Sequence, residues 1–184
     1  MGNETPDQGE HISSELLEQL SQVETTAAVE LLSTRDLATP MAAAALAQHA
    51  LMIAESSPNS AWAWIAIGRE LVSLHADAQA AAARLDYAEA RLHVQEGRFS
   101  EAEGYINRAQ VTWSTLGDYD ALTRSYLGLT QILTVQGRYA EADNAIQEAI
   151  SSLKTRAEAN DEQAMMNLIV ARRNRANLLR YQEN

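Results

Sequence analysis

The chain has 184 residues and a mass of 20.2 kDa, which is enough for one ordinary domain with a buried core. Acidic residues outnumber basic ones by 25 to 14, and the formal net charge is −11. Nucleic-acid binding needs clustered positive charge, so we expect no nucleic-acid partner. The absence of cysteine excludes disulfides, thiolate metal sites and cysteine nucleophiles.

The composition favours helices. Alanine, the best helix former, occurs 33 times, whereas glycine occurs 8 times and proline 3 times. We therefore predict an all-α protein.

No part of the sequence is typical of a targeting signal or a membrane span. The first residues are acidic and polar, and the longest apolar runs, 41–47 and 61–67, hold seven residues each. We expect a cytoplasmic protein with no membrane partner, and a disordered segment over residues 1–11.

Apolar residues recur with a helical period from Ser13 onward and predict two short helices or one bent helix before residue 33. Thr39-Pro40 is a strong start signal for the next helix, and residues 56–59 are a stop signal. A helix with Trp62 and Trp64 follows, and then a long alanine-rich helix over about 78–96. The two tryptophans are separated by roughly 200° on a helix, so one buried face cannot hold both.

The second half of the chain repeats itself after 40 residues. Gly97-Arg98-Phe99 at one helix corner corresponds to Gly137-Arg138-Tyr139 at the next, and an alanine follows at 102 and at 142. A fixed period of this length indicates a helical repeat protein. The glycines fit left-handed helix ends, and the alanines are small where paired helices cross. Ser100 with Glu103 predicts a capping box at the start of the helix after Gly97.

This pattern resembles the tetratricopeptide repeat over about residues 82–157, with a period longer than the usual 34. The resemblance implies a right-handed superhelical solenoid of antiparallel helix pairs, with about seven helices. It implies one repeat domain over 12–184, with repeats at 82–121 and 122–161 and a partial repeat at 162–184. The longer period resembles the variety found in bacterial signalling and regulatory proteins.

The run 171–179 resembles repeats that precede a CHAT caspase-like protease domain in bacterial proteins. The last helix would have an apolar face with no neighbour. Either it acts as a cap or the chain is a piece of a longer protein, and we expect the latter.

No constellation of residues predicts catalysis. The four histidines, His11, His49, His75 and His93, lack the spacing of metal ligands on one helical face. Nucleophile elbows, phosphate-binding loops and calcium loops do not occur. We therefore expect no enzyme, no metal and no cofactor.

The resemblance places the first helix of each pair along a concave groove where partners bind. It implies that the groove residues are Arg84, Tyr87, Arg91, Arg124, Leu127 and Gln131. Arginines in such a groove suit an acidic peptide or a terminal carboxylate. Alternatively, these arginines are solvated surface residues or pair with nearby acids such as Asp86 and Glu89. Arg98 and Arg138 are expected to be structural.

The sequence thus favours an interaction module that binds a protein or peptide partner, within a larger bacterial signalling or regulatory protein. One alternative is a ligand-sensing domain of a transcription regulator. Another is a self-association module, in which the last helix pairs with a second copy to form a homodimer.

Overall fold

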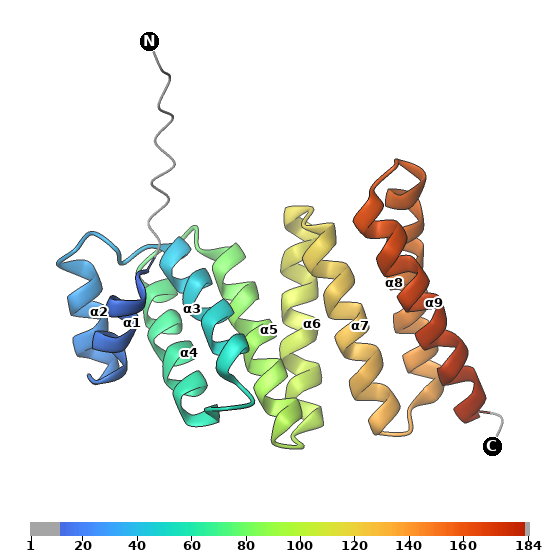
Figure 1. Cartoon of the computed structure of the whole chain (residues 1–184), viewed down its shortest axis with the longest axis horizontal. Helices are drawn as coiled ribbons and strands as arrows, with labels where there is room; N and C mark the ends of the chain where they lie inside the picture. The colour runs from blue at the N-terminus through green and yellow to red at the C-terminus, as the bar shows by residue number, and fades with distance from the viewer. Residues whose placement is uncertain (1–11, 183–184) are drawn as a thin grey trace, which may run out of the picture. The chain divides into compact units, whose positions relative to one another are not determined.

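The structure, a computed structural model, describes residues 12–182 (Figure 1). Over this range it has nine α-helices and no strand, which confirms the all-α prediction. In chain order the helices are α1 (Ser14–Ser21), α2 (Thr25–Ser33), α3 (Pro40–Ile53), α4 (Pro58–Ser73), α5 (Gln79–Gln95), α6 (Phe99–Leu116), α7 (Tyr119–Val135), α8 (Tyr139–Glu158) and α9 (Glu162–Gln182). The disorder predicted for residues 1–11 lies outside the described residues.

The prediction of about seven helices is wrong, because short breaks divide the chain more often than the apolar periodicity indicates. Glu24 has extended backbone (φ −61°, ψ 153°) and separates α1 from α2. Asn160, with φ +65°, lies in the connection between α8 and α9, close to the predicted repeat boundary between 161 and 162. Each break takes only a few residues, so the hydrophobic pattern continues across it.

Most helix ends follow the local signals in the sequence. The Thr39 side chain accepts a hydrogen bond from the Ala42 N–H at 3.1 Å, with Pro40 at the first helical position. Gly97 and Gly137 have φ near +74° and end α5 and α7 in the left-handed region. These starts and stops agree with the prediction.

The predicted capping box at Ser100 is wrong. Arg98 is the residue that precedes α6, and Ser100 is the second residue of the helix. The Glu103 carboxylate instead binds the Arg138 guanidinium, with 2.5 Å between the nearest atoms. Because Glu103 forms an ion pair with an arginine from another helix corner, its side chain does not take part in a capping box.

The chain divides into two compact units, 1–92 and 93–184, and each is described by itself. In the first unit α3 and α2 pack on α4, and the core also includes the buried face of α5. Trp64 is buried in this core, whereas Trp62 is only partly buried against it. The first unit therefore confirms that one buried face cannot hold both tryptophans.

Gly68 of α4 lies directly against Leu85 of α5. A Cβ at position 68 would lie 2.7 Å from the Leu85 Cδ2 atom. The same helices share an ionic contact: Arg69 binds the nearly buried carboxylates of Asp86 and Glu89, each at 2.5 Å. Burial by itself lowers the pKa of Arg69, but hydrogen bonds and attraction from these carboxylates raise it overall, so the guanidinium stays charged.

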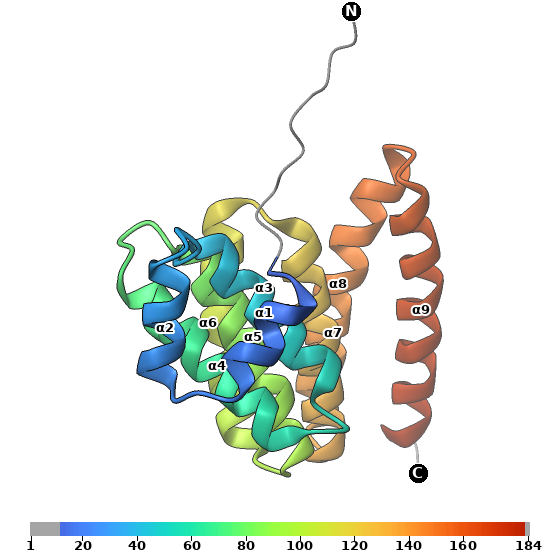
Figure 2. The same cartoon turned by 60° about the vertical axis from the view of Figure 1, so that its left-hand side comes forward.

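In the second unit α6 packs on α7, α7 on α8 and α8 on α9. Figures 1 and 2 show α8 and α9 side by side as an antiparallel pair. Two apolar clusters hold these helices together. One consists of Leu133, Ala142, Ala145, Ile146 and Leu178, and the other of Leu153, Ala164, Leu168 and Ala171. The tetratricopeptide-like superhelix stays a prediction that rests on the 40-residue repeat.

Replacing Ala142 by leucine should overpack the contact of α8 with Leu133 of α7. Ala142 is fully buried, and we expect the change to lower the free energy of unfolding by about 1–3 kcal/mol. Chemical denaturation measures this, with Ala140→Leu, at an exposed position of the same helix, as the control. Equal stability of the two variants would contradict the packing described here.

Replacing Gly104 by alanine should stabilise the protein. Gly104 lies inside α6, and a Cβ there would meet no atom within 4 Å. We expect a gain of about 0.4–1 kcal/mol, because alanine restricts the unfolded chain. The matched control is Gly137→Ala, which should destabilise because φ at 137 is +73°. Thermal unfolding of both variants tests the pair, and opposite signs are expected.

Candidate protein-binding site

The three predicted groove residues of α5 share one side of that helix. Arg84, Tyr87 and Arg91 fall within about 60° of one another at roughly 100° per residue. Arg84 is exposed, and its side chain has no partner among the described residues, whereas Tyr87 and Arg91 are half-buried. The acidic Asp86 and Glu89 lie on roughly the opposite side, where they bind Arg69 of α4. This pairing leaves the other side of α5 with basic side chains.

The corresponding residues of α7 behave in the same way, with one exception. Arg124 and Gln131 are exposed, and Arg124 has no partner within the described part of the chain. Leu127 is half-buried, and it packs against both apolar clusters of the second unit. Leu127 therefore contributes to the core as well as to this side of α7.

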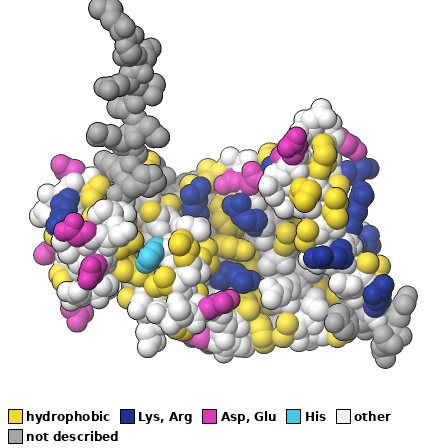
Figure 3. Space-filling model, viewed as in Figure 1, with side chains coloured by type: hydrophobic (Ala, Val, Ile, Leu, Met, Phe, Trp, Pro, Cys, Tyr) yellow, Lys and Arg dark blue, Asp and Glu magenta, His cyan; other side chains and the backbone are white. Residues whose placement is uncertain are grey.

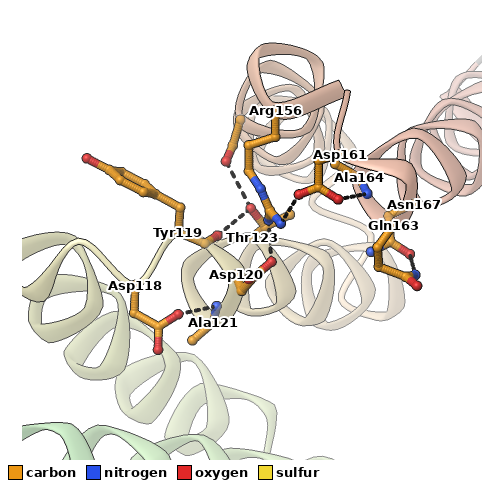
Figure 4. Close-up of polar contacts among 11 residues, drawn as sticks. Asp118, Tyr119, Asp120, Ala121, Thr123, Arg156, Asp161, Gln163, Ala164 and Asn167 are labelled. Carbon is orange, nitrogen blue, oxygen red and sulfur yellow. Dashed lines mark hydrogen bonds and ion pairs between the residues drawn. The ribbon is translucent and has the colours of Figure 1, made fainter. Parts of the chain in front are cut away.

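The nearest acid on the same side of α7 is Asp120, one turn before Arg124. Its carboxylate binds Arg156 of α8 (Figure 4). Arg156 also binds Asp161, which caps α9 by accepting a hydrogen bond from the Ala164 N–H at 2.9 Å. The hydrogen bond from Ala164, together with Arg156, holds the pKa of Asp161 below its ordinary value. One guanidinium at the end of α8 thus joins the first turn of α7 to the N-terminal cap of α9.

The arginines at the two helix corners are also paired. Arg138 binds Glu103 at 2.5 Å and Glu141 at 2.6 Å, and Arg98 binds Glu96. The hydrogen bond from Arg138 lowers the pKa of Glu141. Arg138 thus joins its helix corner to Glu103 of α6, whereas Arg98 contacts Glu96 of its own corner, and the structural role expected for Arg98 stays a prediction.

A surface depression of about 430 Å³ lies at the corner between α7 and α8. The described residues that line it are consecutive: Gly137, Arg138, Tyr139, Ala140 and Glu141. A small-molecule site usually gathers polar groups from several elements, and Arg138 is already held by two carboxylates. The depression therefore gives little support to a small-molecule site.

The six predicted groove residues form two sets, one on α5 in the first unit and one on α7 in the second. Within each set the residues share a side of the helix, and a common groove for all six stays a prediction.

The sequence predicts an apolar face without a neighbour on the last helix, and on α9 the side chains of Met166, Ile169 and Val170 are exposed, as are those of arginines 172 and 173. The sequence contains a signal for the position of these residues: Asp118-x-x-Ala121 recurs as Asp161-x-x-Ala164, which aligns the residues of α9 with those of α7.

Among the described residues, no three His, Cys, Asp or Glu side chains are placed to hold a metal ion, and no helix is long and apolar enough to cross a membrane. No protein-family model matches the sequence, and no curated protein matches it either.

Removing the carboxylate of Asp143 should weaken the dependence of stability on acidic pH. Arg175 binds Asp143 at 2.6 Å, and this hydrogen bond lowers the pKa of the carboxyl. A lowered folded-state pKa gives stability above the unfolded-state value, about 4, that is lost as pH falls through the folded-state value. Denaturation midpoints at about pH 7 and about pH 3 should therefore differ less in Asp143→Asn than in the parent protein. Glu148→Gln, at an exposed position of the same helix, should keep the parent's difference.

Proposed function

We propose that the protein is an interaction module that binds an acidic peptide segment of a partner protein. The supporting observation is which arginines are paired with carboxylates and which are not. In a chain of net charge −11, Arg69, Arg138, Arg156 and Arg175 are held by carboxylates. Arg84 and Arg124, which are 40 residues apart in the repeat, are exposed and have no partner among the described residues.

An exposed guanidinium recognises a carboxylate through two parallel hydrogen bonds. In this proposal Arg84 and Arg91 of the first unit bind acidic side chains or a chain-terminal carboxylate. In the second unit Arg124 does the same by itself, and Gln131 donates to backbone carbonyls. Tyr87 and Leu127 give apolar contact beside these charges. The binding residues stand on helices whose backbone is already ordered, so association costs little conformational entropy.

The broader setting is also a proposal. The resemblance to long tetratricopeptide-like repeats and to repeats before a CHAT domain suggests a repeat segment of a larger bacterial signalling or regulatory protein. A ligand-sensing domain is the weaker alternative, because the depression beside Gly137 is lined by one short stretch of chain. A stabilising small molecule would favour that alternative, since ligand binding raises apparent stability by mass action.

Replacing Arg84, Arg91 and Arg124 together by alanine should weaken peptide binding by at least about tenfold, because charge-assisted hydrogen bonds are lost. The probe is a short fluorescein-labelled peptide of glutamate and leucine with a free C-terminal carboxylate, followed by fluorescence anisotropy. The same peptide with glutamine for glutamate should bind more weakly to the unchanged protein.

The matched control replaces Arg172 by alanine, which removes an exposed arginine from α9 instead. This variant should bind the peptide as the unchanged protein does. Equal binding by the triple variant, with an unchanged circular dichroism spectrum, would contradict the assignment of these arginines to the binding site.

A further inference from the structure

Helix α9 begins in the same way as α7, which allows their faces to be compared residue by residue. Asp118 caps α7 by accepting from the Ala121 N–H at 3.0 Å, and Asp161 caps α9 by accepting from the Ala164 N–H at 2.9 Å. The two caps are 43 residues apart in the sequence. Position 123 of α7 therefore corresponds to position 166 of α9, and position 130 corresponds to position 173.

The face of α7 defined by positions 123 and 130 is covered. Thr123 is 4% exposed, its Oγ1 atom lies 3.0 Å from the Ser152 Oγ atom of α8, and Thr130 is 8% exposed. The equivalent face of α9 is bare within the described part of the chain. Met166 is 63% exposed, and Arg173 is exposed and has no partner among the described residues. In Figure 2 no helix of the second unit lies on the side of α9 that faces away from α8.

This bare face carries charges of both signs, with the acid before its apolar residues and the bases after them. Glu162, Met166, Ile169 and Arg173 fall within about 60° of one another around the helix. Ile169 is 65% exposed, and Glu162 is exposed and lacks a partner among the described residues. Figure 3 shows hydrophobic and basic side chains gathered over α9. The stripe thus reads acid, apolar, apolar, base along one line, and a second exposed base, Arg180, follows two turns after Arg173 on the same line.

We propose that a second copy of the chain docks on this stripe, with the two α9 helices antiparallel about a two-fold axis. In this register Glu162 of each copy meets Arg173 of the other, and Met166 of each copy meets Ile169 of the other. A two-fold contact requires a surface that is complementary to itself, and this stripe meets that requirement. Two ion pairs flank an apolar centre, and covering Met166 and Ile169 removes apolar surface from water.

The charge order favours a second copy over another occupant. A wholly acidic helix on this face would bring like charges against Glu162, and a wholly basic helix would do so against Arg173. A parallel pair of α9 helices would set Glu162 against Glu162 and Arg173 against Arg173. The antiparallel second copy satisfies both charges at once.

This self-association does not depend on the peptide-binding role proposed for α5 and α7. It uses other residues, and its readout is solution mass, whereas the readout for the peptide is anisotropy. Either proposal can therefore fail in its own measurement while the other proposal still holds.

The experiment is light scattering of the full chain over a wide concentration range, with charge-reversal variants. The unchanged protein should form a dimer that dissociates on dilution. Glu162→Arg and Arg173→Glu should each weaken dimerisation by at least about tenfold, because attraction across the stripe becomes repulsion. An equimolar mixture of the two variants should form a heterodimer again, since each then supplies the charge that the other lacks.

The matched control is Arg172→Glu, the same charge change at the neighbouring residue, roughly 100° away from Arg173 around the helix. It should leave the dimer as it is in the unchanged protein. A monomer at every concentration overturns the proposal, and so does a dimer in which the mixed variants do not restore association. Unchanged circular dichroism spectra of the variants exclude unfolding as the cause of any loss.

Discussion

The close packing of neighbouring helices through small side chains is the constraint on which the rest of this structure depends. Gly68 lets α5 approach α4, and Ala142 and Ala149 are fully buried on α8 between α7 and α9. A larger side chain at such a crossing would push the helices apart and expose apolar surface on both. This explains why alanine is so abundant in a chain whose core is built only from helices.

The close packing also decides which charges remain on the surface. Where helices touch, arginines meet carboxylates: Arg69 joins α4 to α5, Arg156 joins α8 to both neighbours, and Arg175 joins α9 to α8. The more exposed of these ion pairs, such as that of Arg156 with Asp120, add little stability individually, but all of them fix which side of each helix is neutralised. Arg84 and Arg124 are exposed and have no carboxylate partner among the described residues.

The stripe on α9 follows from the same packing. Among the described residues, one face of α9 has no neighbouring helix, and the composition of that face determines what can cover it. On α7 the equivalent positions are threonines under α8, whereas on α9 they are Met166 and Arg173. The change from threonine to these residues is what suits the face to a partner with charges of both signs.

The sequence by itself determined the helical class, most helix ends and the repeat, because glycine, proline and capping side chains act within a few residues of the backbone they control. Only the tertiary structure decided which of Trp62 and Trp64 is buried, that Glu103 binds Arg138 rather than capping α6, and that Leu127 packs into the core. It also decided that Asp86 and Glu89 bind α4, which sets apart the basic side of α5. These outcomes join residues far apart in the chain, and local spacing carries no information about which distant side chain competes for a contact.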